Sequence, residues 1–195
     1  RSLLANGAHW VRQLPGRLLH NVISHGVARL AEYLETDDPE VRVCGYVSPR
    51  LLELGESELV DELRVIVTEG HRRSAYFTFS SQMHPGLNQF RVFGPANGLL
   101  LDQDQELLLR LPGQRRKSYA EKLIPPLLTA RECVANAAHN LRLLIRREFQ
   151  PKAGMQALIS AFYESILRGG PPPIPYREIR LTARLMDQIF AQLHP

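Results

Sequence analysis

The residues best suited to chemistry lie in one short segment near the start of the chain, at His20, Asn21 and His25. Asn21 and His25 are four positions apart, so on a helix they share one face, about one turn apart. Histidine gains or loses a proton near neutral pH, which suits proton transfer to or from a substrate hydroxyl. A nearby amide could orient that hydroxyl through a hydrogen bond. The spacing alone, however, favours capping or partly buried packing over catalysis.

The histidines and cysteines of the chain show no spacing typical of a metal or redox site. His20 and His25 diverge on a helix, and no third ligand follows at a suitable spacing, so we predict no metal site. Cys44 and Cys133 are expected to be reduced core thiols, which points to a cytoplasmic protein. No stretch approaches the roughly 20 apolar residues of a membrane span, and we expect no signal peptide.

The elements that would position these side chains can be predicted from periodicity. Helical spacing of apolar residues predicts a helix over residues 18–34, ended by Pro39. Alternation and turn signals predict strands near residues 41–46, 63–68, 74–80 and 88–93, then a hairpin of residues 99–101 and 107–109. Further helices are expected over residues 127–147, 155–167 and 177–193.

The order of these elements indicates the fold class. One helix, many strands and then helices, without strand–helix alternation, predict an α+β fold. The short turns favour a mostly antiparallel open sheet with helices on one face. The length and composition fit one domain over residues 1–195.

Several stretches together resemble a known family. Residues 14–26 resemble the opening of the C-terminal domain in the glucose–fructose oxidoreductase and inositol dehydrogenase family (Gfo/Idh/MocA). There, a glycine turn leads into a helix bearing Asp-x-Gly-x-His. His25 matches the histidine, Asn21 the aspartate and Gly16 the turn, whereas Ile23 stands in place of the helix glycine. His9 and Trp10 resemble the aromatic-containing loop before it, and residues 90–102 and 157–175 resemble later family elements.

The resemblance implies a function and a missing partner domain. It implies the substrate-binding and oligomerisation domain of an oxidoreductase that uses NAD or NADP on a sugar, nucleotide-sugar or cyclitol hydroxyl. The cofactor would be held by a Rossmann half upstream of Arg1, so none is expected on this chain alone. His25 and Asn21 are the implied catalytic residues. The candidate substrate-binding residues are Trp10, Arg17 and His20.

One departure from the family pattern keeps an alternative open. Asn21 cannot act as a carboxylate base, so proton transfer would fall on His25 or on a lysine of the missing half. The chain has no Gly-x-Gly-x-x-Gly after a strand, and no Walker or Gly-x-Ser-x-Gly motif. The alternative is therefore a non-catalytic binding or assembly module that keeps the fold; Asn21 favours it, and His25 favours the enzyme.

Charge and exposed apolar residues indicate partners. Residues 110–152 hold ten Lys or Arg against three Glu, although the whole chain carries only +4. The basic helix over residues 127–147 suits an anionic surface such as a membrane, but a solvated face with its apolar side on the sheet is favoured. Nucleic acid is not expected, because aromatic residues are not interleaved with the basic ones. A homo-oligomer is expected through an open sheet face, with Phe77, Phe79 and Phe90 as candidates.

Overall fold

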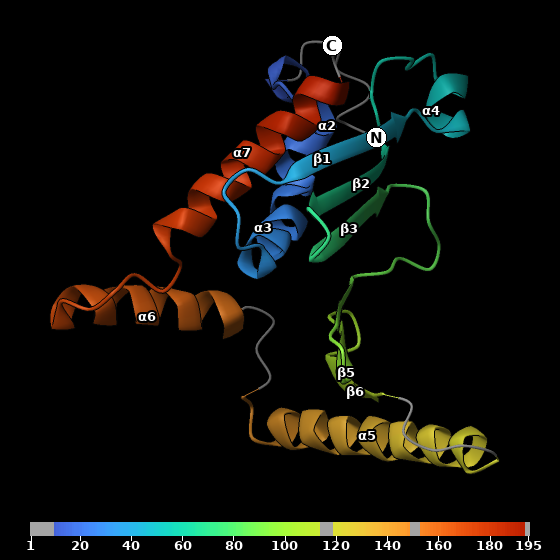
Figure 1. Ribbon diagram of the computed structural model, residues 1–195, viewed down its shortest axis with the longest axis vertical. Helices are drawn as coiled ribbons and strands as arrows, with labels where there is room; N and C mark the ends of the chain where they lie inside the picture. The colour runs from blue at the N-terminus through green and yellow to red at the C-terminus, as the bar shows by residue number, and fades with distance from the viewer. Residues whose placement is uncertain (1–9, 114–118, 149–152, 194–195) are drawn as a thin grey trace. The chain divides into compact units, whose positions relative to one another are not determined.

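The computed structural model describes residues 10–113, 119–148 and 153–193, and it confirms the α+β class (Figure 1). Contacts between residues divide the chain into two compact units. The first unit holds the residues up to Gln82 and those from Ser160 onward, and the second unit spans Met83–Ile159. Each unit contains one antiparallel sheet of three strands.

The first unit is built on β1 (Glu40–Tyr46), β2 (Glu62–Glu69) and β3 (Arg73–Ser80), paired in that order. Val43 pairs with Val65, which pairs with Phe77, so one face of the sheet is apolar. These strands lie close to their predicted bounds, because alternating apolar residues and flanking turns identify half-buried strands well.

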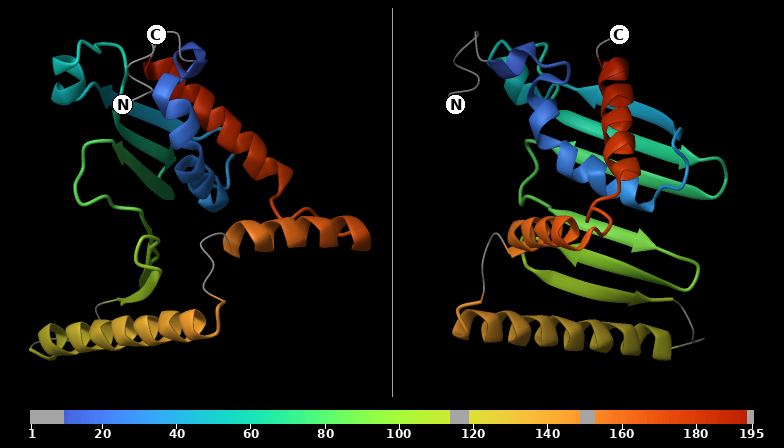
Figure 2. Two further views of the ribbon diagram at one scale, coloured as in Figure 1. Left: turned by 180° about the vertical axis from the view of Figure 1, so that it is seen from behind. Right: turned by 90° about the vertical axis from the view of Figure 1, so that its left-hand side faces the viewer.

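Three helices cover the apolar face of this sheet: α2 (Arg17–Val22), α3 (Ser24–Tyr33) and α7 (Tyr176–Leu193) (Figure 2). The core between the layers includes Ile23 and Val27 from the N-terminal helices, and Leu185 and Ile189 from α7. Burial of such side chains contributes about 1.5–3 kcal/mol each. This packing fixes the helices that carry the predicted site.

The predicted helix over residues 18–34 is interrupted at Ile23, which is fully buried. Hydrogen bonds from Ile23 N–H to the Leu19 carbonyl (3.1 Å) and from Val27 N–H to the Ile23 carbonyl (3.0 Å) keep the buried row in helical spacing. Gly26 lets α3 lie close to the sheet, because a Cβ there would come within 2.2 Å of the Phe77 ring.

One short helix was not predicted. The segment α4 (Pro49–Glu53) follows β1, and Ser48 caps it by accepting a hydrogen bond from Leu51 N–H. The Ser48 N–H and hydroxyl both donate to the carboxylate of Asp61 at 2.7 Å. Asp61 thus connects the loop before α4 to the start of β2.

The second unit contains β4 (Gln89–Phe93), β5 (Asn97–Asp102) and β6 (Leu107–Pro112), in that order. The long helix α5 (Ala120–Ile145) follows, and α6 (Ala153–Arg168) spans the boundary between the units. In the described ranges, no pairing joins β3 to β4, so the strands form two sheets where one was expected. Pro85 and Gly86 lie in the segment between them, where turn residues oppose strand structure.

The basic helix does not rest its apolar side on a sheet, contrary to expectation. Instead, α5 lies along the edge strand β6 (Figure 2) and binds its backbone through polar side chains. Asn136 bonds both the N–H (3.1 Å) and the carbonyl (3.0 Å) of Leu108. Four helical residues rise about 6 Å and two strand residues about 6.7 Å, so the next residues along this helix face also reach the strand. Glu132 accepts from Arg110 N–H on β6 (2.7 Å), and Asn140 donates to the carbonyl of Glu106, just before β6 (3.2 Å).

An equivalent contact closes the outer edge of the first sheet. The Gln192 amide on α7 donates to the Val41 carbonyl (2.9 Å) and accepts from Val43 N–H (3.2 Å) on β1. An exposed edge strand presents unpaired backbone groups that invite association with another chain. Side-chain amides therefore satisfy part of the outer edges of both β1 and β6.

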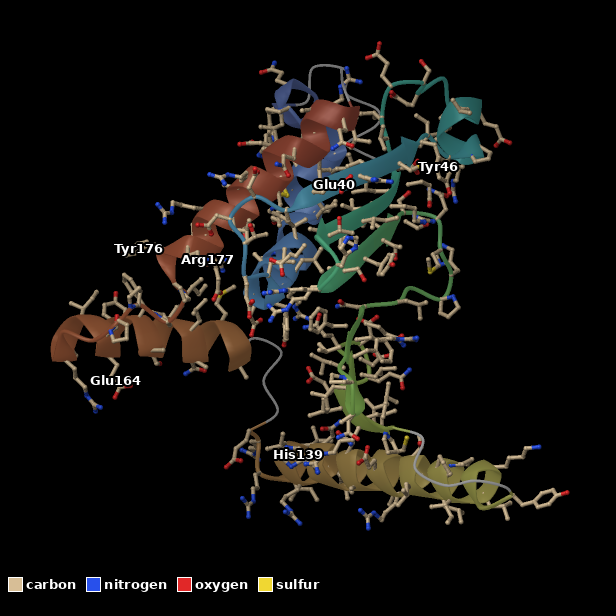
Figure 3. All side chains as sticks on the ribbon, viewed as in Figure 1. Glu40, Tyr46, His139, Glu164, Tyr176 and Arg177 are labelled. Carbon is tan, nitrogen blue, oxygen red and sulfur yellow. The ribbon has the colours of Figure 1, made fainter. Side chains whose placement is uncertain are left out.

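We expect the Asn136→Ala variant to lose about 1 kcal/mol of stability in the second unit, because two exposed hydrogen bonds from the Asn136 side chain to the β6 backbone are removed. Amide hydrogen exchange at Leu108 should accelerate. His139 is exposed on the same helix, and Figure 3 labels it, so His139→Ala serves as the control and should leave that exchange unchanged. Unchanged exchange at Leu108 in Asn136→Ala would contradict the edge contact.

Candidate functional site

His25 and Asn21 lie on the solvent side of the N-terminal helix pair. Each is two positions from residues of the buried row that includes Leu19, Ile23 and Val27, which places it about 200° around the helix axis from them. Both are exposed, and neither side chain has a hydrogen bond or ion pair to another described residue. The core therefore holds the backbone of this pair rigidly, while its imidazole and amide stay accessible to a ligand.

His20 takes a packing role. Its ring is half-buried and stacks on Phe190 of α7, with ring centroids 5.2 Å apart and planes 22° apart. Its Nδ1 atom is buried without a hydrogen-bond partner among the described residues. Gly16 lies on the same aromatic ring, because a Cβ at Gly16 would come within 2.1 Å of Phe190. His20 and Gly16 therefore both pack against the Phe190 ring of α7.

Arg17 is engaged in a long-range contact. Its guanidinium forms an ion pair with the Glu58 carboxylate at 3.0 Å and donates to the Glu58 carbonyl at 2.7 Å. Its backbone has φ 46°, a left-handed conformation that non-glycine residues rarely adopt. These bonds hold the start of α2 against the segment before β2.

Trp10 is the first residue of the short 3-10 helix η1 (Trp10–Gln13), and its side chain is 58% exposed. The neighbouring His9 lies outside the described residues. Of the five predicted site residues, His25 and Asn21 share one accessible face. His20 and Arg17 are committed to contacts with other elements.

The described part of the chain holds no group of three His, Cys, Asp or Glu side chains arranged to bind a metal. Within those same ranges, each helix is too short or too polar to cross a bilayer.

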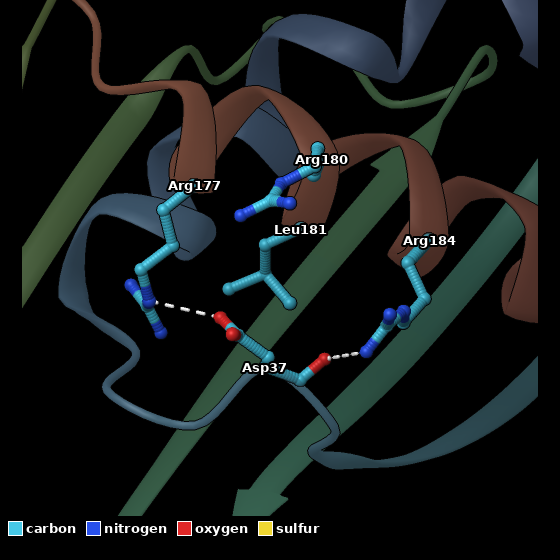
Figure 4. A pocket seen from close by; sticks show the side chains of 5 residues that line it. All are labelled: Asp37, Arg177, Arg180, Leu181 and Arg184. Carbon is cyan, nitrogen blue, oxygen red and sulfur yellow. Dashed lines mark hydrogen bonds and ion pairs between the residues drawn. The ribbon is translucent and has the colours of Figure 1, made fainter.

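A second polar site was missed by the sequence analysis. A cavity of about 100 Å³ lies between α7 and the loop after α3, lined by Asp37, Arg177, Arg180, Leu181 and Arg184 (Figure 4). The three arginines follow at spacings of three and four, which places them along one helical face. That spacing is a sequence signal for a basic face. The partner Asp37 is far away in the chain and could not be identified from it.

Comparison with known proteins adds no relative: no protein-family model, no curated protein and no solved structure matches this chain.

Proposed function

We propose that this chain is the substrate-binding domain of a nicotinamide-dependent oxidoreductase acting on a hydroxyl of a sugar, nucleotide sugar or cyclitol. The observation that supports it is the accessible His25 and Asn21 pair, presented by helices that are anchored in the core through Leu19, Ile23 and Val27. A fixed backbone with accessible polar side chains is what precise positioning of a small polar ligand requires.

In this proposal, His25 takes the proton from the substrate hydroxyl during oxidation and returns it during reduction. Asn21 orients the same hydroxyl, because an amide both donates and accepts hydrogen bonds but cannot act as a base. A nicotinamide, when bound, supplies the ring that accepts the hydride during oxidation.

The described residues do not fit a dinucleotide. They contain no strand followed by a glycine-rich turn and a long helix, which is the unit that cradles a pyrophosphate. The five-residue α4 is the only helix directly after a strand of the first sheet in the described ranges, and it is entered through Ser48-Pro49. In our proposal the cofactor is therefore held by another domain.

Assembly through the open sheet face is part of the same proposal, with a correction to its residues. Phe77 and Phe79 pack against the core of the first unit, because they share the face of Val65 and Leu63. The opposite face carries exposed Tyr46, Ile66 and Tyr76, which are better candidates for contact with a second copy. Phe90 is half-buried on β4. A non-catalytic assembly module is the second candidate, favoured by Asn21 in place of a carboxylate.

Ligand binding tests the proposal directly. We expect sugars or cyclitols titrated into the ¹⁵N-labelled chain to shift the amide signals of Asn21, His25 and their neighbours, and His25→Ala to weaken this binding. The matched control is His71→Ala, which changes an exposed histidine in the β2–β3 turn and should bind as the wild type does. A panel of such ligands that shifts no signal on α2 or α3 would count against the substrate-binding role.

A further inference from the structure

We propose that the cavity between α7 and the loop after α3 binds a phosphate monoester through Arg180 and Arg184. The cavity has a volume of about 100 Å³, and its polar lining consists of three guanidinium groups and one carboxylate. Its residues belong to the first unit. This inference does not depend on the oxidoreductase proposal, because it involves none of the residues placed there.

Arg177 uses its guanidinium to hold the loop after α3 against α7. It donates to the carbonyls of Leu34 (2.9 Å) and Thr36 (3.0 Å), and it pairs with the Asp37 carboxylate at 2.9 Å. Glu69 binds the N–H groups of the same loop, accepting from Glu35 N–H and Thr36 N–H at 2.7 Å. The loop after α3 is therefore a fixed wall of the cavity.

Arg180 and Arg184 retain donors that the fold does not use. Arg184 donates one hydrogen bond to the Asp37 carbonyl, whereas Arg180 has no hydrogen bond or ion pair to any described residue. Figure 4 shows both guanidinium groups at the cavity, with a dashed line to Arg184 and none to Arg180. A guanidinium carries five donors in a fixed fork, so most of the donors of these two side chains are free for a ligand.

The charge at the cavity is unbalanced. Like charges three or four positions apart on a helix destabilise it, and Asp37 is the single carboxylate that lines the cavity with the three arginines. The adjacent carboxylates, Asp38 and Glu178, do not line it. The cavity thus has a surplus of two positive charges, and a bound dianion would remove the repulsion.

A phosphate monoester matches this lining in both charge and geometry. It carries about −1.5 to −2 charges at neutral pH and three acceptor oxygens. Guanidinium forks bind such oxygens in pairs. The cavity could hold several water molecules, so one phosphoryl group fits. It lies beyond the C-terminal end of α3, and that end is about 12 Å along the helix from His25, so the two sites are separate.

Titration of the chain with inorganic phosphate tests this site, at constant ionic strength set with chloride. We expect the Nε–H signals of Arg180 and Arg184 to shift and the melting temperature to rise. Arg180→Gln should weaken phosphate binding about tenfold or more, because it removes charge-assisted hydrogen bonds. Its melting temperature in phosphate-free buffer should equal or exceed that of the wild type, because the substitution removes a charge that Arg177 and Arg184 repel.

Arg72→Gln is the matched control, because Arg72 is an exposed arginine in the β2–β3 turn. Glucose 6-phosphate and glucose are titrated in parallel. Tighter binding of the sugar phosphate than of phosphate identifies a ligand that carries its phosphate on a sugar, and equal binding identifies phosphate itself. The proposal is overturned if neither phosphate compound shifts Arg180, if Arg72→Gln weakens binding equally, or if Arg180→Gln lowers the melting temperature without phosphate.

Discussion

Replacing His25 by alanine is expected to lower kcat/KM by about 10²- to 10⁴-fold when the chain is assayed together with the cofactor-binding domain of our proposal. This is the usual contribution of a positioned proton-transfer group. The effect should be this large because Asn21 cannot replace the imidazole as a base. The fold should be unaffected, because the His25 side chain is exposed and contacts no described residue through a hydrogen bond or ion pair. Steady-state kinetics and circular dichroism measure the two effects separately.

Chemical rescue separates proton transfer from a structural effect. Added imidazole should restore part of the activity of His25→Ala, because a free imidazole can occupy the exposed space and carry the proton. It should not change the wild type or the His71→Ala control. Normal turnover in His25→Ala would exclude the assigned role. Absence of turnover in the wild-type protein on any sugar or cyclitol would favour the assembly module.

Local patterns predicted most of the secondary structure. The strands were predicted because alternating apolar residues lie on one sheet face, as Val41 and Val43 do in β1. The final helix was predicted over residues 177–193, and its Leu181, Leu185 and Ile189, which recur at helical spacing, are buried in the structure. The helix interruption at Ile23 was not predicted, because the apolar spacing continues through it unchanged. The five-residue α4 is too short to show any period.

Contacts between distant segments could not be predicted. Nothing near His20 in the sequence indicates that its ring stacks on Phe190, and nothing near Arg17 indicates the pair with Glu58. The choice of sheet face was wrong for Phe77 for a related reason: alternation groups residues by face, but it does not say which face the helices will cover. The spacing of Asn21 and His25 alone favoured capping or partly buried packing, whereas both side chains are exposed.

Replacing Asp61 by alanine is expected to destabilise the first unit by about 3 kcal/mol, since hydrogen bonds to a buried charged group contribute about 1.5–3 kcal/mol and an unmet buried partner costs about 1–3 kcal/mol. Asp61 is fully buried and accepts from Ser48, from the Ser81 hydroxyl at 2.6 Å and from the Gln82 amide at 3.2 Å. No cation in the described part of the chain pairs with it. Hydrogen exchange of the β2 amides, such as that of Val65, measures the loss within this unit.

The same carboxylate should make stability depend on pH. Burial raises the pKa of Asp61, but the hydrogen bonds from Ser81, Ser48 and Gln82 outweigh burial and hold the pKa below its ordinary value of 3.8. A group whose pKa is lower in the folded state stabilises the fold above its unfolded pKa. Its contribution should therefore be complete above about pH 4 and should be lost as the pH falls through the folded value. Asp61→Asn should show a shallower loss of stability in acid.

Salt distinguishes Asp61 from an exposed carboxylate. The pKa of Glu40 is also lowered, by the hydrogen bond and charge of Arg42, but Glu40 lies on the surface. High salt should screen the Glu40 pair, because charges in solvent are screened over about 10 Å at 0.1 M ionic strength. The hydrogen bonds of Asp61 are buried and should persist. If high salt abolished the difference in acid stability between the wild type and Asp61→Asn, the buried network would not be its source, because only solvent-exposed charges respond to salt in that way.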